Sequence, residues 1–210
     1  MKLKPLKLLK PKCPILHLTK GMQPIVLIGS PGSGKGTQGR KLADYFQIPH
    51  ISTGEILRDH VQRGTLIGYC VRDLLDKGLL VPDGLMEDLI TSRLRAMDCE
   101  EGYILDGYPR TLQQAQWYYA HYGHPSVVLL EVPEGEVLRR IVARNEGRPD
   151  DGNATIVIDR LEEYSKFTAP LIGYYEREAK LFRVDGTIGI DNVFNRIKDF
   201  LESNESIAYG

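Results

Sequence analysis

A glycine-rich nonapeptide that directly follows a short apolar run constrains this chain more than any other feature. Residues 29–37 read Gly-Ser-Pro-Gly-Ser-Gly-Lys-Gly-Thr, and Ile-Val-Leu-Ile precedes them at 25–28. A buried strand, a glycine turn and a helix in this order are the setting of a phosphate-binding loop. The glycines let backbone N–H groups converge on an anion, and the helix adds the positive end of its dipole. Lys35 can then reach the outer phosphates of a nucleotide, whereas an ordinary glycine turn would need none of these features together.

The bulk composition excludes several classes of protein. The chain has 210 residues, is 42% hydrophobic and 26% charged, and carries a net charge of −1. It is long enough for one domain with a substantial core, and its charge indicates neither nucleic acid nor an anionic membrane as partner. No stretch approaches the about 20 apolar residues of a membrane span. The cysteines Cys13, Cys70 and Cys99 form no CxxC pair, so we expect neither a zinc site nor a disulfide framework, and reduced thiols in a cytoplasmic protein. A monomer is expected because the sequence shows no seam of surplus apolar residues.

Residues 1–23 form a basic N-terminal extension with six lysines and no acid. Its three prolines argue against a long helix, and its lysines interrupt the apolar run that a secretory signal needs. It also lacks the arginine and serine of a transit peptide. The simplest interpretation is a solvated extension. Organellar targeting, or a basic arm that docks on a partner or an anionic surface, stays open as an alternative.

Residues 24–210 alternate strand and helix signals, which predicts a single α/β domain with a parallel sheet flanked by helices. Apolar residues at 193, 197, 200 and 201 predict one face of a final helix. Two stretches fit the sheet poorly and are expected to be inserted lobes, 52–82 and the short, turn-rich 145–154. The strand candidates are apolar on consecutive positions, as in strands buried on both faces, and comprise 25–28, 48–51, 103–105, 127–132 and 181–184.

Asp106 directly follows the strand candidate 103–105. A carboxylate at that place can hold magnesium, directly or through water, beside the phosphate loop. The alternative is a strand-end carboxylate that accepts hydrogen bonds from loop N–H groups. The general phosphate-loop pattern has Ser or Thr directly after the lysine, but here Gly36 intervenes before Thr37. With this departure, the loop resembles that of the nucleoside monophosphate kinases.

Two further blocks make the resemblance specific. Residues 106–114 read Asp-Gly-Tyr-Pro-Arg-Thr-Leu-Gln-Gln, and residues 51–58 read Ile-Ser-Thr-Gly-Glu-Ile-Leu-Arg. Together with the phosphate loop they resemble adenylate kinase, over almost the whole chain without its basic extension. The resemblance implies reversible, magnesium-dependent transfer of a phosphoryl group from ATP to AMP, giving two ADP. It also implies that 52–82 is the NMP-binding lobe and 145–154 a short lid.

The resemblance assigns site residues position by position. For ATP it implies Gly32, Ser33, Gly34, Lys35, Gly36, Thr37, Arg140 and Arg144. For AMP it implies Thr53, Gly54, Arg58, Val81, Gly107, Arg110, Gln114, Arg148 and Arg160. For catalysis it implies Lys35, Arg58, Arg110, Arg144, Arg148 and Arg160. Magnesium contacts are expected at Thr37 and Asp106, and a role in lid closure at Asp150 and Asp151.

Some of these residues also have purely structural interpretations. Ser52 with Glu55, and Thr111 with Gln114, have the spacing of capping boxes at helix starts. For the second pair, capping by Thr111 and a base contact by Gln114 are compatible. Arg110 could pair with a surface acid.

The helix expected after Pro133 carries a further alternative. Glu136 and Arg140 have the spacing of an exposed ion pair, which contributes only a few tenths of a kcal/mol. Leu138, Ile141 and Val142 are expected to form the buried face of this helix.

Two rival functions follow from the same residues. UMP/CMP kinases usually carry Ala and Asn at the places of Thr53 and Thr111, so this chain favours AMP. A regulatory protein that binds nucleotides without catalysis is the other rival, and the intact charged positions argue against it. Leu79 stands where the family often has lysine, which predicts a weaker contact at the base pocket. Because no cysteine lies in the lid, no structural zinc is expected there.

Overall fold

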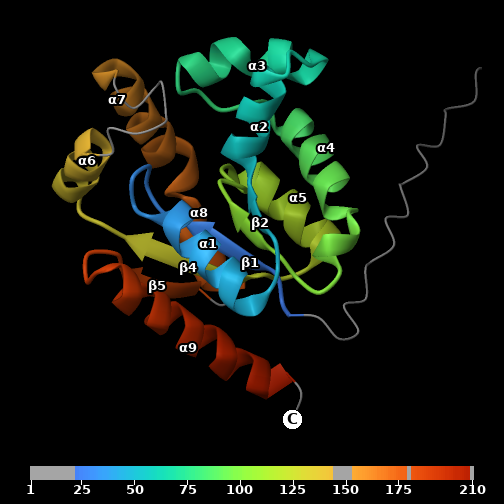
Figure 1. The fold of residues 1–210 in the computed structure, drawn as a ribbon, viewed down its shortest axis with the longest axis vertical. Helices are drawn as coiled ribbons and strands as arrows, with labels where there is room; N and C mark the ends of the chain where they lie inside the picture. The colour runs from blue at the N-terminus through green and yellow to red at the C-terminus, as the bar shows by residue number, and fades with distance from the viewer. Residues whose placement is uncertain (1–21, 144–152, 179–180, 209–210) are drawn as a thin grey trace, which may run out of the picture.

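The computed structural model describes residues 22–143, 153–178 and 181–208. Its centre is a five-stranded sheet in which every pairing is parallel, in the order β2-β3-β1-β4-β5 (Figure 1). The expected α/β class is therefore confirmed. One strand candidate matches at both ends, and the other four shift by one or two residues because strand ends depend on pairing partners. The strands are β1 (Ile25–Ile28), β2 (His50–Ser52), β3 (Ile104–Asp106), β4 (Ser126–Glu131) and β5 (Leu181–Asp185).

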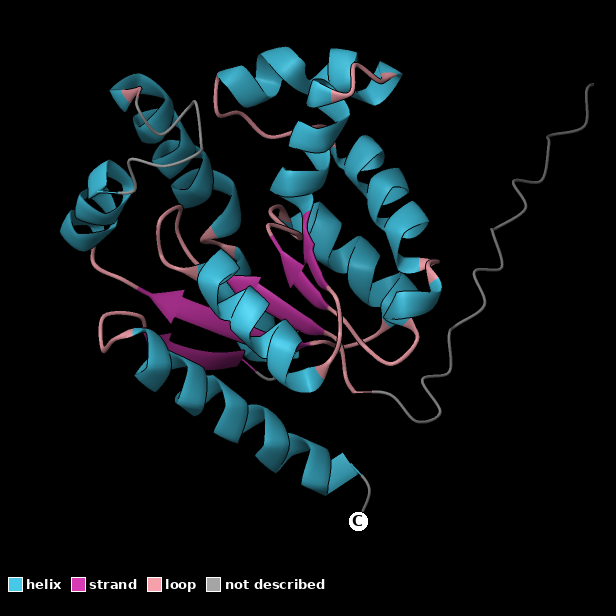
Figure 2. Cartoon of the chain, in the orientation of Figure 1, coloured by secondary structure: helices cyan, strands magenta, loops and turns pink. Residues whose placement is uncertain are grey.

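Helices cover both faces of the sheet, as the cyan layers around the magenta strands show (Figure 2). One face is covered by α1 (Lys35–Phe46) and α9 (Ile190–Ala208). The other face is covered by α4 (Asp83–Leu94), α5 (Leu112–Tyr122) and α8 (Leu171–Glu178). The remaining α-helices of the described residues are α2 (Thr53–Gln62), α3 (Leu66–Asp76), α6 (Glu134–Ala143) and α7 (Ala154–Glu163).

Alternation along β1 divides the core into two clusters. Ile25 and Leu27 pack toward α1 and α9, whereas Val26 and Ile28 pack toward α4, α5 and α8. All four side chains are at most 2% exposed, which explains why the run is apolar on consecutive positions. The expected stripe on the last helix is confirmed, since its residues at 193, 197 and 201 are buried and Phe200 is partly buried against the same cluster.

Helices α2 and α3 lie together beyond the carboxyl ends of β2 and β3, within the predicted lobe 52–82 (Figure 1). They approach most closely at Gly68, where an added Cβ would lie 2.1 Å from the backbone oxygen of His60. Thr65 caps α3 by accepting a hydrogen bond from the Gly68 N–H at 3.1 Å. The close packing of this helix pair therefore depends on a residue without a side chain.

Gly68→Ala should lower the free energy of unfolding by about 1–3 kcal/mol, because backbone cannot yield to the added methyl group. The loss comes despite the roughly 1 kcal/mol by which alanine exceeds glycine in helix propensity. Urea unfolding of the full chain measures it. Gly84→Ala in α4 is the matched control, since nothing lies within 4 Å of its added Cβ. That variant should gain about 0.5–1 kcal/mol, and equal stability of the two variants would contradict the packing argument.

The capping box expected at Ser52 and Glu55 is wrong. Ser52 is the N-cap of α2, but its side chain makes no capping hydrogen bond. The same residue ends β2 and pairs there with Asp106, so strand pairing fixes its conformation, and its side chain is buried. Glu55 is exposed, and its carboxylate lies 3.6 Å from a guanidinium nitrogen of Arg40.

The buried face expected for α6 is also partly wrong. Val137 and Ile141 are buried, whereas Leu138 is 38% exposed and Val142 is 79% exposed. The buried face is therefore turned relative to the prediction. Val137 and Ile141 pack with Val157 of α7 in a small separate cluster. Because α6 packs against this cluster and not against the sheet, its buried face is narrow.

Two expectations concern segments that the structure describes in part or not at all. Residues 1–21 of the basic extension, and the lid residues Arg144, Arg148, Asp150 and Asp151, lie outside the described residues. Among the helices that are described, none is long and apolar enough to cross a membrane.

Candidate active site

The site lies where the topology of the sheet opens a crevice. β1 and β3 are neighbours, but the helices that follow them, α1 and α5, pack on opposite faces. Ligands of open parallel sheets bind at such a switch point, outside the carboxyl ends of the strands. A cavity of about 600 Å³ lies there, lined by segments between Leu27 and Thr168. Its size is that of a site for a small ligand.

The phosphate loop forms one wall of this cavity. Gly34 has φ 101° and serves as the N-cap of α1, a conformation that glycine adopts without strain. The first turn of α1 thus begins at the cavity, which Gly34, Lys35 and Gly36 line. The Lys35 ammonium donates hydrogen bonds to the carbonyls of Gly29 at 2.7 Å and Ser30 at 2.9 Å. Dipole, N–H groups and ammonium together make this wall a site for an anion.

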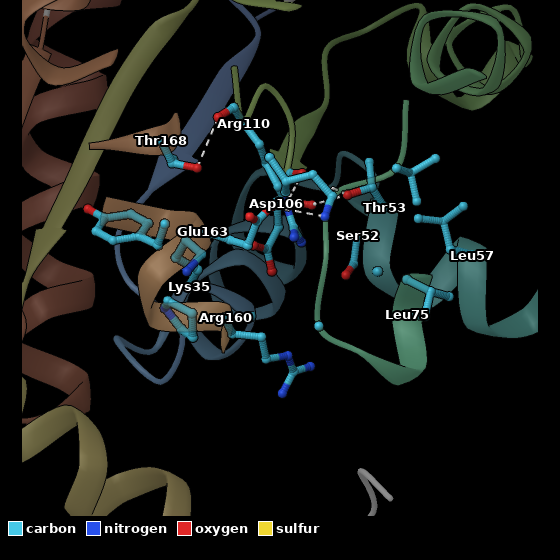
Figure 3. A pocket seen from close by; sticks show the side chains of 18 of the residues that line it. Lys35, Ser52, Thr53, Leu57, Leu75, Asp106, Arg110, Arg160, Glu163 and Thr168 are labelled. Carbon is cyan, nitrogen blue, oxygen red and sulfur yellow. Dashed lines mark hydrogen bonds between the residues drawn. The ribbon is translucent and has the colours of Figure 1, made fainter. Parts of the chain in front are cut away.

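Asp106 lies at the centre of the site (Figure 3). Burial alone would raise the pKa of its carboxyl group. The close contact with His50 and the charges of Lys35, His50 and Arg110 outweigh burial and lower the pKa below its usual value. The carboxylate is thus charged at neutral pH, beside the phosphate loop. His50 Nε2 lies 3.5 Å from Asp106 Oδ2, and sequence reasoning missed this histidine, which carries no recognisable signal.

Three arginines from separate elements line the same cavity: Arg58 of α2, Arg110 of the loop after β3, and Arg160 of α7. The Arg110 guanidinium donates to the Gly107 carbonyl at 2.8 Å. Desolvation of the Arg110 guanidinium by the protein around the cavity lowers the pKa of Arg110. The negative charge of Asp106 raises this pKa, the positive charges of Arg160 and Arg58 lower it, and the net shift is downward. Like charges gathered in one cleft are typical of a functional site that binds an anion.

A further group of polar side chains forms the wall beside α4 and α5. Thr53 and Gln114 are 1% and 2% exposed. The Thr53 hydroxyl donates to the Gly107 carbonyl at 2.9 Å. Gln114 Nε2 donates to Asp83 Oδ1 at 2.7 Å, and Gln114 Oε1 accepts from the Arg110 N–H at 2.7 Å. Sequence reasoning gave Asp83 no role of its own, because its contact is with a residue distant in the chain.

The expected cap of α5 is confirmed in its first half. Thr111 accepts a hydrogen bond from the Gln114 N–H at 3.1 Å. In a full capping box, the side chain three residues after the N-cap also accepts a hydrogen bond from the N–H of the N-cap residue. Here Gln114 Oε1 accepts from the N–H of Arg110 instead, so the carboxamide of Gln114 also fixes the loop that carries this arginine.

Helix α7 contacts the loop that leads into Val81. Glu163 Oε2 accepts a hydrogen bond from the Leu80 N–H at 3.2 Å. Next to it, Gly78 packs against Ile156 and Arg160, with no room for a larger side chain. Leu79, where the family often has lysine, lines the cavity and is partly exposed. The helix that carries Arg160 is thereby joined to the wall that carries Val81, a contact that sequence reasoning missed.

Most of the described site residues meet in this cavity, but three do not line it. Ser33, Thr37 and Arg140 lie outside its lining. Arg140 forms the expected ion pair with Glu136 at 2.7 Å and also donates to the Gly186 carbonyl at 2.9 Å. The predicted site residues that do line the cavity are Gly32, Gly34, Lys35, Gly36, Thr53, Gly54, Arg58, Val81, Asp106, Gly107, Arg110, Gln114 and Arg160.

The residues present suit magnesium bound together with nucleotide phosphates. Mg²⁺ prefers oxygen ligands, keeps several waters, and is usually held by one or two carboxylates plus substrate phosphates. Asp106 is a charged carboxylate whose Oδ2 lies against Gly36, next to Thr37. Across the described ranges, no group of three or more His, Cys, Asp or Glu side chains is placed to hold a metal ion. A single charged carboxylate beside the phosphate loop fits a metal that the substrate largely coordinates.

Comparison with known proteins identifies the family. The sequence model of the adenylate kinase family matches residues 27–180. An adenylate kinase of Xylella fastidiosa is 45% identical over 180 residues, covering 82% of this chain and 96% of the relative. The corresponding values for an adenylate kinase of Methanosarcina barkeri are 41%, 85% and 98%, and for one of Xanthomonas oryzae they are 44%, 84% and 98%. With this family match over a phosphate-loop cavity that three arginines line, the chain belongs to the adenylate kinase family.

Proposed function

We propose that this chain catalyses reversible phosphoryl transfer from ATP to AMP, giving two ADP. The observation that carries the proposal is the arrangement of charged side chains around one cavity. Lys35 of the phosphate loop lies on one side of Asp106, Arg110 and Arg160 lie on other sides (Figure 3), and Arg58 lines the same cavity. The phosphates of ATP and AMP, bound end to end in this cavity, would have cationic side chains along their whole length. Such neutralisation and positioning are most of what phosphoryl transfer requires from a protein.

The proposed roles follow from place and charge. Lys35 and the N–H groups of the loop hold the donor phosphates. Arg58 and Arg110 hold the acceptor phosphate in line, and Arg160 neutralises charge that develops on the transferring group. The acceptor phosphate is already an anionic nucleophile, so no general base is needed. Arg144 and Arg148 are proposed to join this group from the lid, and Asp150 and Asp151 to accompany lid closure, which excludes water.

We further propose that magnesium accompanies ATP in this cavity. Thr37 and Asp106 would hold it, directly or through water. When bound there, Mg²⁺ neutralises charge on the donor phosphates. The contribution of the chain itself is to keep Asp106 charged, through the contact with His50 and the neighbouring cations.

The base of AMP is proposed to bind between Thr53 and Val81 of the lobe 52–82 and Gln114 of α5. Leu57 and Met86 also line the cavity, so it offers apolar side chains beside a few polar groups, as most small-molecule sites do. Arg140, which borders the phosphate loop, is proposed to serve the ATP side.

The direct test offers MgATP with AMP, CMP and UMP separately at equal concentration and measures ADP formation. We expect rapid turnover with AMP and at least tenfold lower kcat/KM with the pyrimidine nucleotides. With a pyrimidine base in the cavity, polar groups of the Gln114 carboxamide would lack hydrogen-bond partners. A preference for CMP or UMP would keep the phosphate site and overturn the base assignment. Binding of ATP without turnover of any acceptor would overturn the catalytic proposal.

A further inference from the structure

The carboxamide of Gln114 is held at both ends by groups of fixed polarity. Its nitrogen donates to Asp83 Oδ1 and its oxygen accepts from the Arg110 N–H, each at 2.7 Å. A carboxylate can only accept hydrogen bonds and a backbone N–H can only donate. A carboxamide turned by 180° would face oxygen toward carboxylate and N–H toward N–H. Gln114 is 2% exposed, so water could not relieve either mismatch, and one orientation is strongly favoured.

Asp83 is itself held in place. The Thr111 hydroxyl lies 3.1 Å from both carboxylate oxygens of Asp83, and Asp83 is the first residue of α4. A carboxylate there is also favoured by the helix dipole. The acceptor that faces Gln114 therefore comes from a rigid element with its own support.

The two hydrogen bonds leave part of the carboxamide free for a ligand. A carboxamide has two N–H donors and two oxygen lone pairs, and Asp83 and Arg110 use one of each. Gln114 lines the cavity, whereas Asp83 does not. A 6-aminopurine presents an acceptor at N1 beside a donor at its amino group, and one donor with one acceptor on the protein matches that edge. A 6-oxopurine presents the reverse, a donor at N1 beside an acceptor at O6.

We propose that Asp83 is a specificity-determining positioning residue, which locks Gln114 in the orientation that pairs with 6-aminopurine nucleotides and rejects 6-oxopurine nucleotides. The proposal rests on the proposed function, in which Gln114 contacts the base of the acceptor. A glutamine that could turn freely would pair with either edge. The lock makes pairing with a 6-oxopurine require two buried polar mismatches.

The test replaces Asp83 with asparagine, which has the same shape but both donates and accepts. Asp83→Asn removes one of the two mismatches of the turned carboxamide, so the ratio of kcat/KM for AMP to kcat/KM for IMP should fall by about tenfold or more. Both acceptors are assayed with saturating MgATP. A merely structural role would lower kcat/KM for the two acceptors together and leave the ratio unchanged. Thermal unfolding checks the fold, and Asp83→Ser, whose hydroxyl also donates or accepts, is the second variant.

Two further variants separate the possible outcomes. Asp88→Asn removes a charge from an exposed position of the same helix and should leave the ratio unchanged. Gln114→Met removes the carboxamide and should raise KM for AMP. An unchanged ratio in Asp83→Asn, with a raised KM in Gln114→Met, would overturn the role of Asp83 and keep the base contact. If neither variant changes KM or the ratio, the base contact fails, and this proposal fails with it.

Discussion

Replacing Lys35 with methionine should lower kcat/KM for MgATP and AMP by about a thousandfold, with a stable fold. Methionine keeps most of the length of the side chain but removes the ammonium that faces the proposed donor phosphates. The charge acts in a cavity where protein replaces much of the water, so its loss weakens transition-state stabilisation strongly. Initial rates of ADP formation measure the effect, and the thermal unfolding midpoint measures stability.

Lys41→Met is the matched control, because the same change is made on the same helix. Lys41 pairs with Asp191 at the surface, with 2.7 Å between Nζ and Oδ1, and does not line the cavity. Its removal should leave kcat/KM within about twofold, since exposed ion pairs contribute little. Equal losses in the two variants would show that general charge, rather than the phosphate loop, causes the effect.

Arg110→Ala should lower kcat/KM by about 10²–10³-fold and change the thermal unfolding midpoint little. The side chain of Arg110 donates to a single carbonyl, that of Gly107. The bonds that hold the surrounding loop come from its backbone, since the N–H of Arg110 donates to Gln114 and its carbonyl accepts from Thr168. Truncation therefore removes the cation and leaves the local framework. Kinetics with AMP varied at fixed MgATP measure the loss.

Arg63→Ala is the control for this variant. Arg63 is exposed at the end of α2 and pairs with Asp59 at 3.0 Å. Its replacement should leave activity nearly unchanged. If kcat/KM of Arg110→Ala matched that of the parent protein, Arg110 would have no place in the site.

Features that depend on neighbours in the chain could be predicted from the sequence. The phosphate loop is one of them, because the strand, the turn and the helix that define it are consecutive, and the residue pattern that gives the turn also gives the anion site. The parallel sheet followed from runs such as 25–28, whose consecutive apolar residues match burial on both faces. Thr111 as a helix cap followed from a spacing of three residues.

Features that depend on tertiary packing could not be predicted. His50 reaches Asp106 only because β2 and β3 pair, and Asp83 meets Gln114 only because α4 and α5 pack together. The buried face of α6 was misjudged for the same reason. Val142 is as apolar as Ile141, but only one of the two has a neighbouring cluster to pack against.

The hydrogen bond between Glu163 and the backbone of Leu80 has a consequence for evolution. One partner is a side chain and the other is an N–H that every residue except proline carries. Substitutions at position 80 can therefore accumulate without any compensating change at position 163. Correlated mutation between the two positions would not reveal the contact, although it joins the helix of Arg160 to the loop of Val81. Selection would act on one side only, as constraint on the acid at 163 and exclusion of proline at 80.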